Sequence, residues 1–121
     1  MADRVKLFFD GGLRPAGMET AVVAAGKSHI CRALGPGTSM EAEWRALIAA
    51  ATLAQAEGWD DAVLLGDAAA VIAQATGKVR CPPAYRAHRD ALHGMGGRWR
   101  IRYVKRTQNL AGIALARLHA R

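Results

Sequence analysis

The stretch AVLLGDAAAVIAQAT, residues 62–76, decides the fold class of this chain. Its first four residues, 62–65, form a short continuous apolar run, which is typical of a β-strand covered on both faces. Gly66 and Asp67 then lead directly into a helical segment, residues 68–76. Because a strand followed at once by a helix indicates a parallel crossover, the stretch predicts an α/β fold with parallel strand pairing.

Three β-prone runs precede this stretch. Residues 4–9 end at the turn signal Asp-Gly-Gly of residues 10–12, which places the aspartate of that signal at the C-terminal end of a first strand. Residues 20–25 and 29–34 are two further runs, separated by the Gly-Lys-Ser of residues 26–28. We expect them to form a hairpin that pairs with the first strand, giving an antiparallel meander.

The remaining segments alternate between helix and strand signals. Thr38 and Glu41 match a capping box and predict a helix to about Glu57. Three more elements are expected: a helix from Pro82 to about Leu92, a strand over residues 98–104, and a helix over residues 110–119. The order predicts a single domain, residues 1–121, with a mixed five-stranded sheet (three antiparallel strands, then two parallel) flanked by about four helices.

Charge is distributed very unevenly along the 121 residues. Residues 1–77 carry six Lys/Arg and nine Asp/Glu, a net charge of −3, whereas residues 78–121 carry eleven Lys/Arg and one acid, a net charge of +10. Nucleic acid gains by releasing counterions against a basic surface, and so does an acidic membrane surface. The charge pattern therefore indicates an anionic partner without choosing between these two.

The sequence gives no indication of a membrane-spanning protein or of a disulfide-stabilised one. No apolar stretch approaches the ~20 residues that a membrane span requires, and the first residues lack the apolar segment of a secretory signal. We expect a cytoplasmic protein without a membrane partner or an obligate protein partner. Cys31 and Cys81 lie fifty positions apart, without ligands at metal-binding spacing, and are expected to be reduced, buried thiols.

Three acids stand at the ends of the predicted elements, and two of them have simple structural explanations. Asp10 suits a tight turn before Gly-Gly, and Asp67 suits the N-cap of a helix. Glu43 differs, because the positions three, four, seven and eight residues on are all apolar, so its carboxylate points toward the core side of its helix. A divalent ion such as Mg²⁺ would offset the cost of placing these acids together, so we interpret them as one metal site.

Four clusters of residues make the chain similar, from end to end, to a type 1 ribonuclease H. The clusters are Phe8-Phe9-Asp10-Gly11-Gly12; Thr38-Ser39-Met40-Glu41-Ala42-Glu43-Trp44-Arg45-Ala46-Leu47; Leu64-Leu65-Gly66-Asp67 with Val71-Ile72, Gln74 and Gly77-Lys78; and Tyr103-Val104-Lys105-Arg106 with Asn109. Their order and spacing agree with that family over nearly the whole chain. The resemblance implies the ribonuclease H-like fold.

The resemblance also implies an activity, which is cleavage of the RNA strand of an RNA/DNA hybrid with two Mg²⁺ or Mn²⁺ ions about 4 Å apart. Asp10 would touch both ions, Glu43 would hold one, and Asp67 would hold the ion that activates the attacking water. Thr38, with Ser39 beside it, matches a position where the family contacts a DNA phosphate. The backbone around Gly11 and Gly12 would lie near the RNA sugar, where 2′-hydroxyl groups distinguish RNA from DNA.

Basic residues near the C-terminus extend the predicted nucleic-acid surface. Arg98, Arg100 and Arg102 are spaced by two and share one face of the predicted strand, and Lys105 and Arg106 continue this patch toward the acids. The alternative is a solvated strand face that prevents edge pairing, and both roles are compatible. On the opposite face, Trp99, Ile101 and Tyr103 are expected to pack in the core.

The chain departs from the family at the fourth carboxylate. The family pattern Asn-x-x-Ala-Asp reads Asn109-Leu110-Ala111-Gly112 here, so Gly112 stands where the aspartate is expected. Waters, Asn109 or His119 could substitute as ligands; alternatively, Asn109 caps the last helix and His119 is a surface residue. The family's Asn pair is replaced by Ser39 and Met40. A metal-dependent nuclease is the first hypothesis, a non-catalytic nucleic-acid-binding domain the second, and a protein-interaction module the third.

Overall fold

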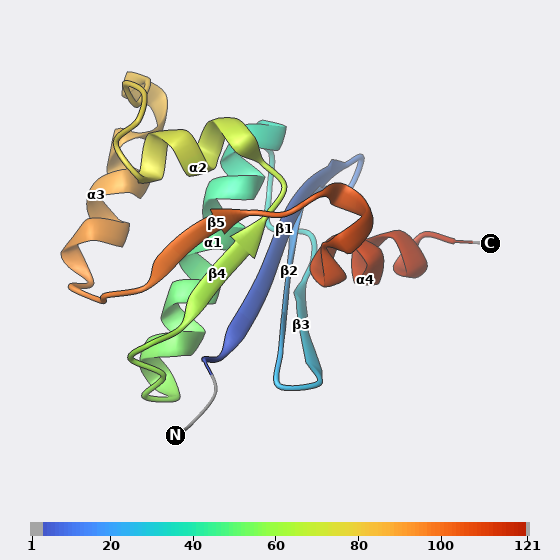
Figure 1. Ribbon diagram of the computed structural model, residues 1–121. Helices are drawn as coiled ribbons and strands as arrows, with labels where there is room; N and C mark the ends of the chain where they lie inside the picture. The colour runs from blue at the N-terminus through green and yellow to red at the C-terminus, as the bar shows by residue number, and fades with distance from the viewer. Residues whose placement is uncertain (1–3, 121) are drawn as a thin grey trace.

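The computed structural model describes residues 4–120, and its strands form one mixed sheet (Figure 1). The strands are β1 (Lys6–Arg14), β2 (Gly17–Ala24), β3 (Lys27–Cys31), β4 (Val63–Gly66) and β5 (Arg100–Tyr103), in the order β3-β2-β1-β4-β5. The pairs β1–β2 and β2–β3 are antiparallel, whereas β1–β4 and β4–β5 are parallel. This arrangement confirms the predicted mixed five-stranded sheet of an α/β, ribonuclease H-like fold.

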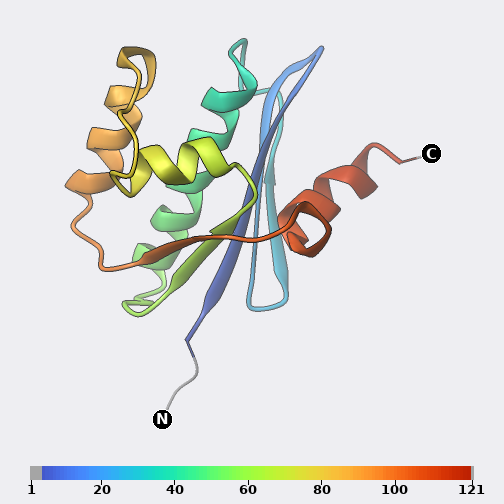
Figure 2. The same cartoon turned by 45° about the horizontal axis from the view of Figure 1, so that its top comes forward.

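The helices cover the two faces of the sheet unequally. They are α1 (Ser39–Ala56), α2 (Ala69–Ala75), α3 (Arg86–Gly94) and α4 (Leu110–Leu118), with the short 3-10 helices η1 (Pro83–Tyr85) and η2 (Arg106–Gln108). Figures 1 and 2 show α1, α2 and α3 on one side of the sheet and α4 alone on the other. Among the described residues, no helix is both long enough and apolar enough to cross a bilayer.

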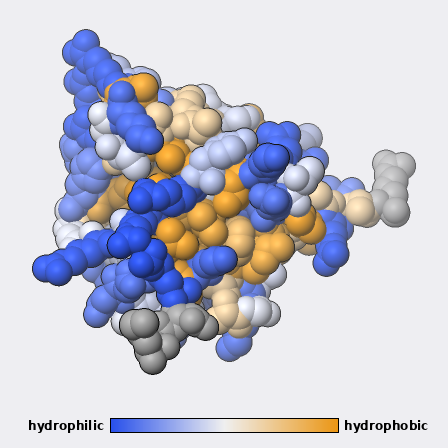
Figure 3. Space-filling view, in the orientation of Figure 1, coloured by the Kyte–Doolittle hydropathy of each residue, from blue (hydrophilic) through white to orange (hydrophobic). Residues whose placement is uncertain are grey.

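The main core lies between the sheet and α1. Side chains alternate between the faces of a strand, so Leu7 and Phe9 of β1 point toward α1, where they pack with the fully buried Trp44. A smaller cluster under α4 contains Ala21, Ala111 and Leu115, with Phe8 and Val23 packed against it. The rest of this second face is open, and Figure 3 shows apolar residues at its centre with hydrophilic residues around them.

The largest difference from expectation concerns the first hairpin. The prediction of a turn at residues 10–12 is wrong, because β1 continues through them to Arg14, and β2 begins at Gly17, opposite Arg14. Gly11 is required for another reason: a Cβ there would lie 2.2 Å from the backbone oxygen of Ala42. The glycine therefore permits β1 to approach the start of α1, and the structural explanation of Asp10 as a turn residue is wrong as well.

Other differences reflect edge positions. Strand β3 begins before the predicted residue 29 and ends before residue 34, and all of its residues are exposed because it forms one edge of the sheet. The prediction that Cys31 is buried is therefore wrong, whereas Cys81 is buried and both thiols are free. Tyr103, on the opposite edge strand β5, is 54% exposed and not a core residue.

Candidate metal centre

Asp10 and Asp67 are brought together by the parallel pairing of β1 with β4. The register pairs Phe8 with Leu65, so that its continuation places Asp10 opposite Asp67, immediately beyond the end of β4. Asp67 consequently lies just past the carboxyl end of β4, where open α/β sheets place their ligand sites, and Asp10 lies beside it in the middle of β1. Helix α2 begins after Ala68 and has no side-chain cap, so the capping explanation for Asp67 is wrong.

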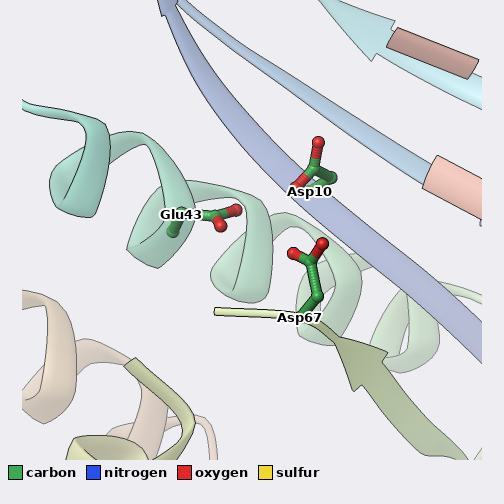
Figure 4. A group of neighbouring side chains, drawn as sticks. All are labelled: Asp10, Glu43 and Asp67. Carbon is green, nitrogen blue, oxygen red and sulfur yellow. The ribbon is translucent and has the colours of Figure 1, made fainter. Parts of the chain in front are cut away.

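Glu43 reaches the same point from the first turns of α1. Thr38 caps this helix by accepting a hydrogen bond from the Glu41 amide at 3.0 Å, as the capping signal predicts. The close approach of Gly11 to α1 allows the Gly11 amide to donate a hydrogen bond to the Glu43 carboxylate. Figure 4 shows the three carboxyl groups directed toward one another, and one oxygen from each lies within 4.8 Å of the others. We call these residues the three-carboxylate group.

The electrostatics of this group favour a bound cation. Burial, followed by the negative charge of Asp67, raises the pKa of Asp10 to about 6. Burial, followed by the charge of Asp10, raises the pKa of Glu43 to about 8, although the Gly11 amide opposes this change. Three partly buried acids repel one another when they are all ionised, so a divalent cation or retained protons must compensate.

The group opens onto a pocket of about 660 Å³, whose lining includes Gly11, Gly12, Ser39, Arg106 and Gly112. The Arg106 Nε lies 3.3 Å from the Asp67 Oδ2, and the Arg106 side chain is 91% exposed whereas that of Asp67 is 6% exposed. The arginine therefore lies at the rim of the pocket and does not fill it. It provides a positive charge beside the acids, facing solvent.

Other residues predicted to bind nucleic acid lie outside this lining. Arg98, Arg100 and Arg102 are exposed on and before the edge strand β5, and Lys105 is exposed between that strand and η2. Thr38 is exposed at the start of α1, and its hydroxyl lies 2.9 Å from the hydroxyl of Tyr85, a neighbour that sequence reasoning missed. A basic edge and a polar helix start thus flank the pocket.

Asn109 and His119 are engaged away from the three-carboxylate group. The Asn109 side-chain oxygen accepts from the Ala111 amide at 3.1 Å, and its nitrogen donates to the Phe9 carbonyl at 3.0 Å, so this buried residue caps α4 and ties it to β1. The His119 Nε2 lies 2.8 Å from the Glu19 Oε2. A Cβ added at Gly112 would lie 3.5 Å from the Asp10 Oδ2, so α4 approaches the acids here without a carboxylate.

Glu19 and Arg14 also line the pocket, and sequence reasoning missed both. Glu19 lies opposite Gly12 in the register, on the sheet face that carries Asp10, and it is 2% exposed. The predicted strand began at residue 20, so Glu19 fell outside it. Extending the alternation of that strand by one residue would have placed Glu19 on the same face as Ala21.

Comparison with known proteins gives one family and several similar structures. Residues 22–119 match the family model described as reverse transcriptase-like. The ribonuclease H1 of Halobacterium salinarum is 30% identical with a TM-score of 0.78, and the alignment covers 93% of this chain and 94% of that one. The N-terminal ribonuclease H domain of a Mycobacterium tuberculosis protein is 23% identical with a TM-score of 0.70, covering 98% and 100%.

A third structure is that of LC11-RNase H1 in complex with an RNA/DNA hybrid, which is 18% identical with a TM-score of 0.73 and 88% coverage of both chains. At this identity, the similarity concerns the fold. A comparison with curated protein sequences gave no match.

Proposed function

This chain belongs to the reverse transcriptase-like, ribonuclease H-like family, and on that premise we propose that it is a metal-dependent endonuclease that hydrolyses the RNA strand of RNA/DNA hybrids. The observation that carries the proposal is the convergence of Asp10, Glu43 and Asp67 within 4.8 Å. A similar fold in complex with such a hybrid, that of LC11-RNase H1, supports the choice of substrate.

The donor set fits Mg²⁺ or Mn²⁺. The three side chains offer hard carboxylate oxygens from a partly buried, solvent-connected site, and such ions are held by a few carboxylates together with waters and phosphate oxygens. Three ionised acids carry a charge of −3, so two divalent ions would leave the site with a charge of +1, which suits a phosphodiester. Burial, followed by the negative charge of Asp10, raises the pKa of Glu43, and bound cations would offset both effects.

The protein residues have separate parts in the proposed reaction. When bound, divalent ions would activate a water molecule and stabilise the leaving oxygen during in-line displacement. Asp10, central on β1, would hold both ion positions, with Glu43 on one side and Asp67 on the other. Arg106, at the rim, would contact the phosphate and orient it, because a guanidinium group matches phosphate geometry. The Gly11 amide fixes the Glu43 carboxylate.

The test is cleavage of a labelled RNA/DNA hybrid with Mg²⁺ or Mn²⁺. We expect Asp10→Asn to reduce cleavage by about 10³-fold or more, because loss of a charged group at the reacting centre removes several kcal/mol of transition-state stabilisation. Glu57→Gln is the matched control, since Glu57 is an exposed acid at the other end of α1. Equal cleavage by Asp10→Asn and the parent protein would contradict the proposal, as would absence of cleavage with both ions.

Gly112 favours a second candidate function, a nucleic-acid-binding domain without turnover. The last helix approaches Asp10 without an acid, and Arg106 already pairs with Asp67, so ion binding is weakened in two ways. This candidate predicts binding to the hybrid whose logarithmic affinity falls with the logarithm of salt concentration, with no cleavage under any metal condition. Cleavage that depends on Asp10 would exclude it.

A further inference from the structure

A second charged cluster lies beside the three-carboxylate group and centres on Glu19 of β2. The Glu19 side chain is 3% exposed, and its carboxylate contacts three basic groups. The His119 Nε2 lies at 2.8 Å, the Arg14 Nε at 3.5 Å and the Arg32 Nε at 3.7 Å. One buried carboxylate therefore faces two permanent cations and a histidine. We call these four residues the Glu19 cluster.

The sheet register explains why these side chains meet. Gly12 of β1 lies opposite Glu19, and Arg14 follows two residues later on the same face of that strand. On the other side of β2, Cys31 pairs with Thr20, so Arg32 comes next to Glu19 as the chain leaves β3. The end of α4 supplies His119. Segments from three strands and one helix thus converge on a single acid.

The cluster contains more positive charge than Glu19 requires. A buried carboxylate needs a cation or hydrogen-bond donors, and His119 together with one arginine would satisfy that need. Two guanidinium groups near the same carboxylate also repel each other. Among residues 4–120, neither Arg14 nor Arg32 lies within ion-pair distance of another acid. The arrangement is therefore suited to a second anion on the outer side of the arginines.

The arginines have free donors on that outer side. Their side chains are 45% and 54% exposed, and each meets Glu19 through its Nε. Within the described part of the chain, the terminal nitrogens of both guanidinium groups donate no hydrogen bond. Each arginine is paired with Glu19 through its Nε, so the terminal N–H groups of the guanidinium remain available, and such groups can bind two oxygens of a phosphate at once.

The position of the cluster connects it with the three-carboxylate group. Arg14 and Glu19 line the same pocket as Asp10 and Glu43. Arg14 is four residues from Asp10, and the two side chains share a sheet face, so they are separated by roughly 13 Å along β1. A nucleic-acid strand that crosses the acids and continues along β1 would reach the arginines with its backbone.

We infer that Arg14 and Arg32, held in place by Glu19, form a binding subsite for a backbone phosphate of the strand that crosses the three-carboxylate group. The inference rests on the proposed nucleic-acid function. Glu19 has a positioning role, because it binds the inner edges of the arginines and leaves their outer edges to the phosphate. Since one phosphate shared by two arginines adds no base contact, this subsite contributes affinity and register without sequence preference.

The test measures equilibrium binding of a labelled RNA/DNA hybrid in EDTA, where cleavage is prevented. We expect Arg14→Gln and Arg32→Gln each to raise Kd about fivefold and to reduce the slope of log affinity against log salt by about 1. Arg4→Gln is the matched control, because Arg4 is an exposed arginine that pairs with Asp61 before β1 begins, away from the pocket. Arg4→Gln lowers the net charge of the protein by one, as Arg14→Gln and Arg32→Gln do.

Three outcomes separate this inference from the proposed function. If the parent protein cleaves the hybrid but Arg14→Gln and Arg32→Gln bind no differently from Arg4→Gln, the subsite is wrong and the nuclease proposal stands. If the two arginines determine affinity and no cleavage occurs in Mg²⁺ or Mn²⁺, the subsite stands and the nuclease proposal is wrong. If the parent protein does not bind the hybrid, both are overturned.

The positioning role of Glu19 has a separate readout. Glu19→Gln makes the protein more positive by one charge, so a purely electrostatic contribution predicts tighter binding of the hybrid. Loss of the fixed orientation of the arginines predicts weaker binding, by about threefold or more, with circular dichroism confirming that the variant is folded. Tighter binding by the folded variant would show that Glu19 does not position the arginines.

Discussion

The three-carboxylate group and the Glu19 cluster place buried acids on the same pocket and surround them differently. In the first, Asp10, Glu43 and Asp67 face one another, and the nearest cation is the exposed Arg106. In the second, Glu19 alone faces two arginines and a histidine. Glu19 is the more deeply buried, at 2% exposed against the intermediate burial of the other three, so the difference lies in the compensation that the chain itself provides.

Under the proposed function, this difference assigns a different ligand to each half of the pocket. Around the three-carboxylate group, burial followed by the charge of Asp10 raises the pKa of Glu43 to about 8, and the proposed function places metal ions there. Around Glu19 the chain supplies more positive charge than the carboxylate needs, and the two arginines face solvent, where an anion can reach them. A phosphodiester backbone with bound divalent ions carries both cations for the acidic half and anionic phosphates for the basic half. The two regions therefore fit a single extended ligand.

The largest effect on folding stability is expected from Gly11→Ala, which would displace α1, and Glu43 with it, from β1. A Cβ at this position would lie 2.2 Å from the Ala42 oxygen, a backbone atom that cannot move without shifting α1. We expect a loss of about 3 kcal/mol in the free energy of unfolding, because overpacking against backbone forces strands and helices apart. Chemical denaturation measures this loss.

Gly12→Ala is the control for this change. Its Cβ would meet only the Glu19 side chain, at 3.8 Å, which is an ordinary contact. A similar loss of stability in the two variants would show that the approach of β1 to α1 does not depend on Gly11.

The comparison predicts that two Glu→Gln substitutions change the free energy of unfolding in opposite directions in metal-free protein at pH 8. Glu19→Gln removes a carboxylate that compensates its neighbours, and it should cost about 2 kcal/mol. Glu43→Gln removes a charge that its neighbours repel, and it should stabilise by about 1 kcal/mol. Denaturant unfolding in the presence of a chelator measures both changes.

The effect of Glu43→Gln also depends on pH. The pKa of Glu43 is raised from 4.5 in the unfolded chain to about 8 in the folded one. Between these pH values the unfolded chain loses this proton and the folded chain keeps it, so the free energy of unfolding falls as pH rises. The advantage of the variant should consequently disappear near pH 4. A constant difference between pH 4 and pH 8 would contradict this assignment.

Metal binding should release a proton from the three-carboxylate group. Between pH 6 and 8, we expect Mn²⁺ affinity to rise by up to about tenfold per pH unit, because Glu43 retains its proton below a pKa of about 8. Titration calorimetry in two buffers of different ionisation enthalpy measures the number of protons released. Binding at pH 7 without proton release would show that Glu43 is not a ligand.

The smallest effect is expected from Gly112→Asp, which adds an acid to the first region. The new Cβ would lie 3.5 Å from the Asp10 Oδ2 without a clash, so the carboxylate could join the group. We expect metal affinity to increase about fivefold, since affinity depends on ligand number and charge. Gly94→Asp, in open space at the end of α3, adds the same charge elsewhere. Equal affinities in these two variants would count against a vacant ligand position.

Sequence reasoning identified the three-carboxylate group but misplaced the local structure around it. The group follows from short-range signals: an apolar run before Asp67 and an apolar stripe headed by Glu43. Asp-Gly-Gly was assigned to a turn because its composition is typical of one. Gly11 is needed instead because the backbone of Ala42, thirty-one positions away, lies against it. A local sequence pattern does not contain that information.

The Glu19 cluster was not predicted, for a related reason. Its members are spaced by 5, 13 and 87 positions along the chain, from Arg14 through Glu19 and Arg32 to His119, and no motif joins them. Only the register of β1, β2 and β3, together with the packing of α4 on the sheet, places them together. The basic face of β5, in contrast, was visible because alternation within one strand is a local signal, although the edge position that exposes Tyr103 was not.

The two attachments of α4 have a consequence for how the molecule assembles. Asn109 bonds the Phe9 carbonyl at one end of this helix and His119 meets Glu19 at the other, and each contact joins residues 100 positions apart. Closing such long loops is entropically costly and slow relative to local folding, so non-local contacts of this kind form late. We therefore expect the wall of the pocket to be completed after β1, β2 and β3 have paired, and during translation it requires nearly all of these residues to have been made.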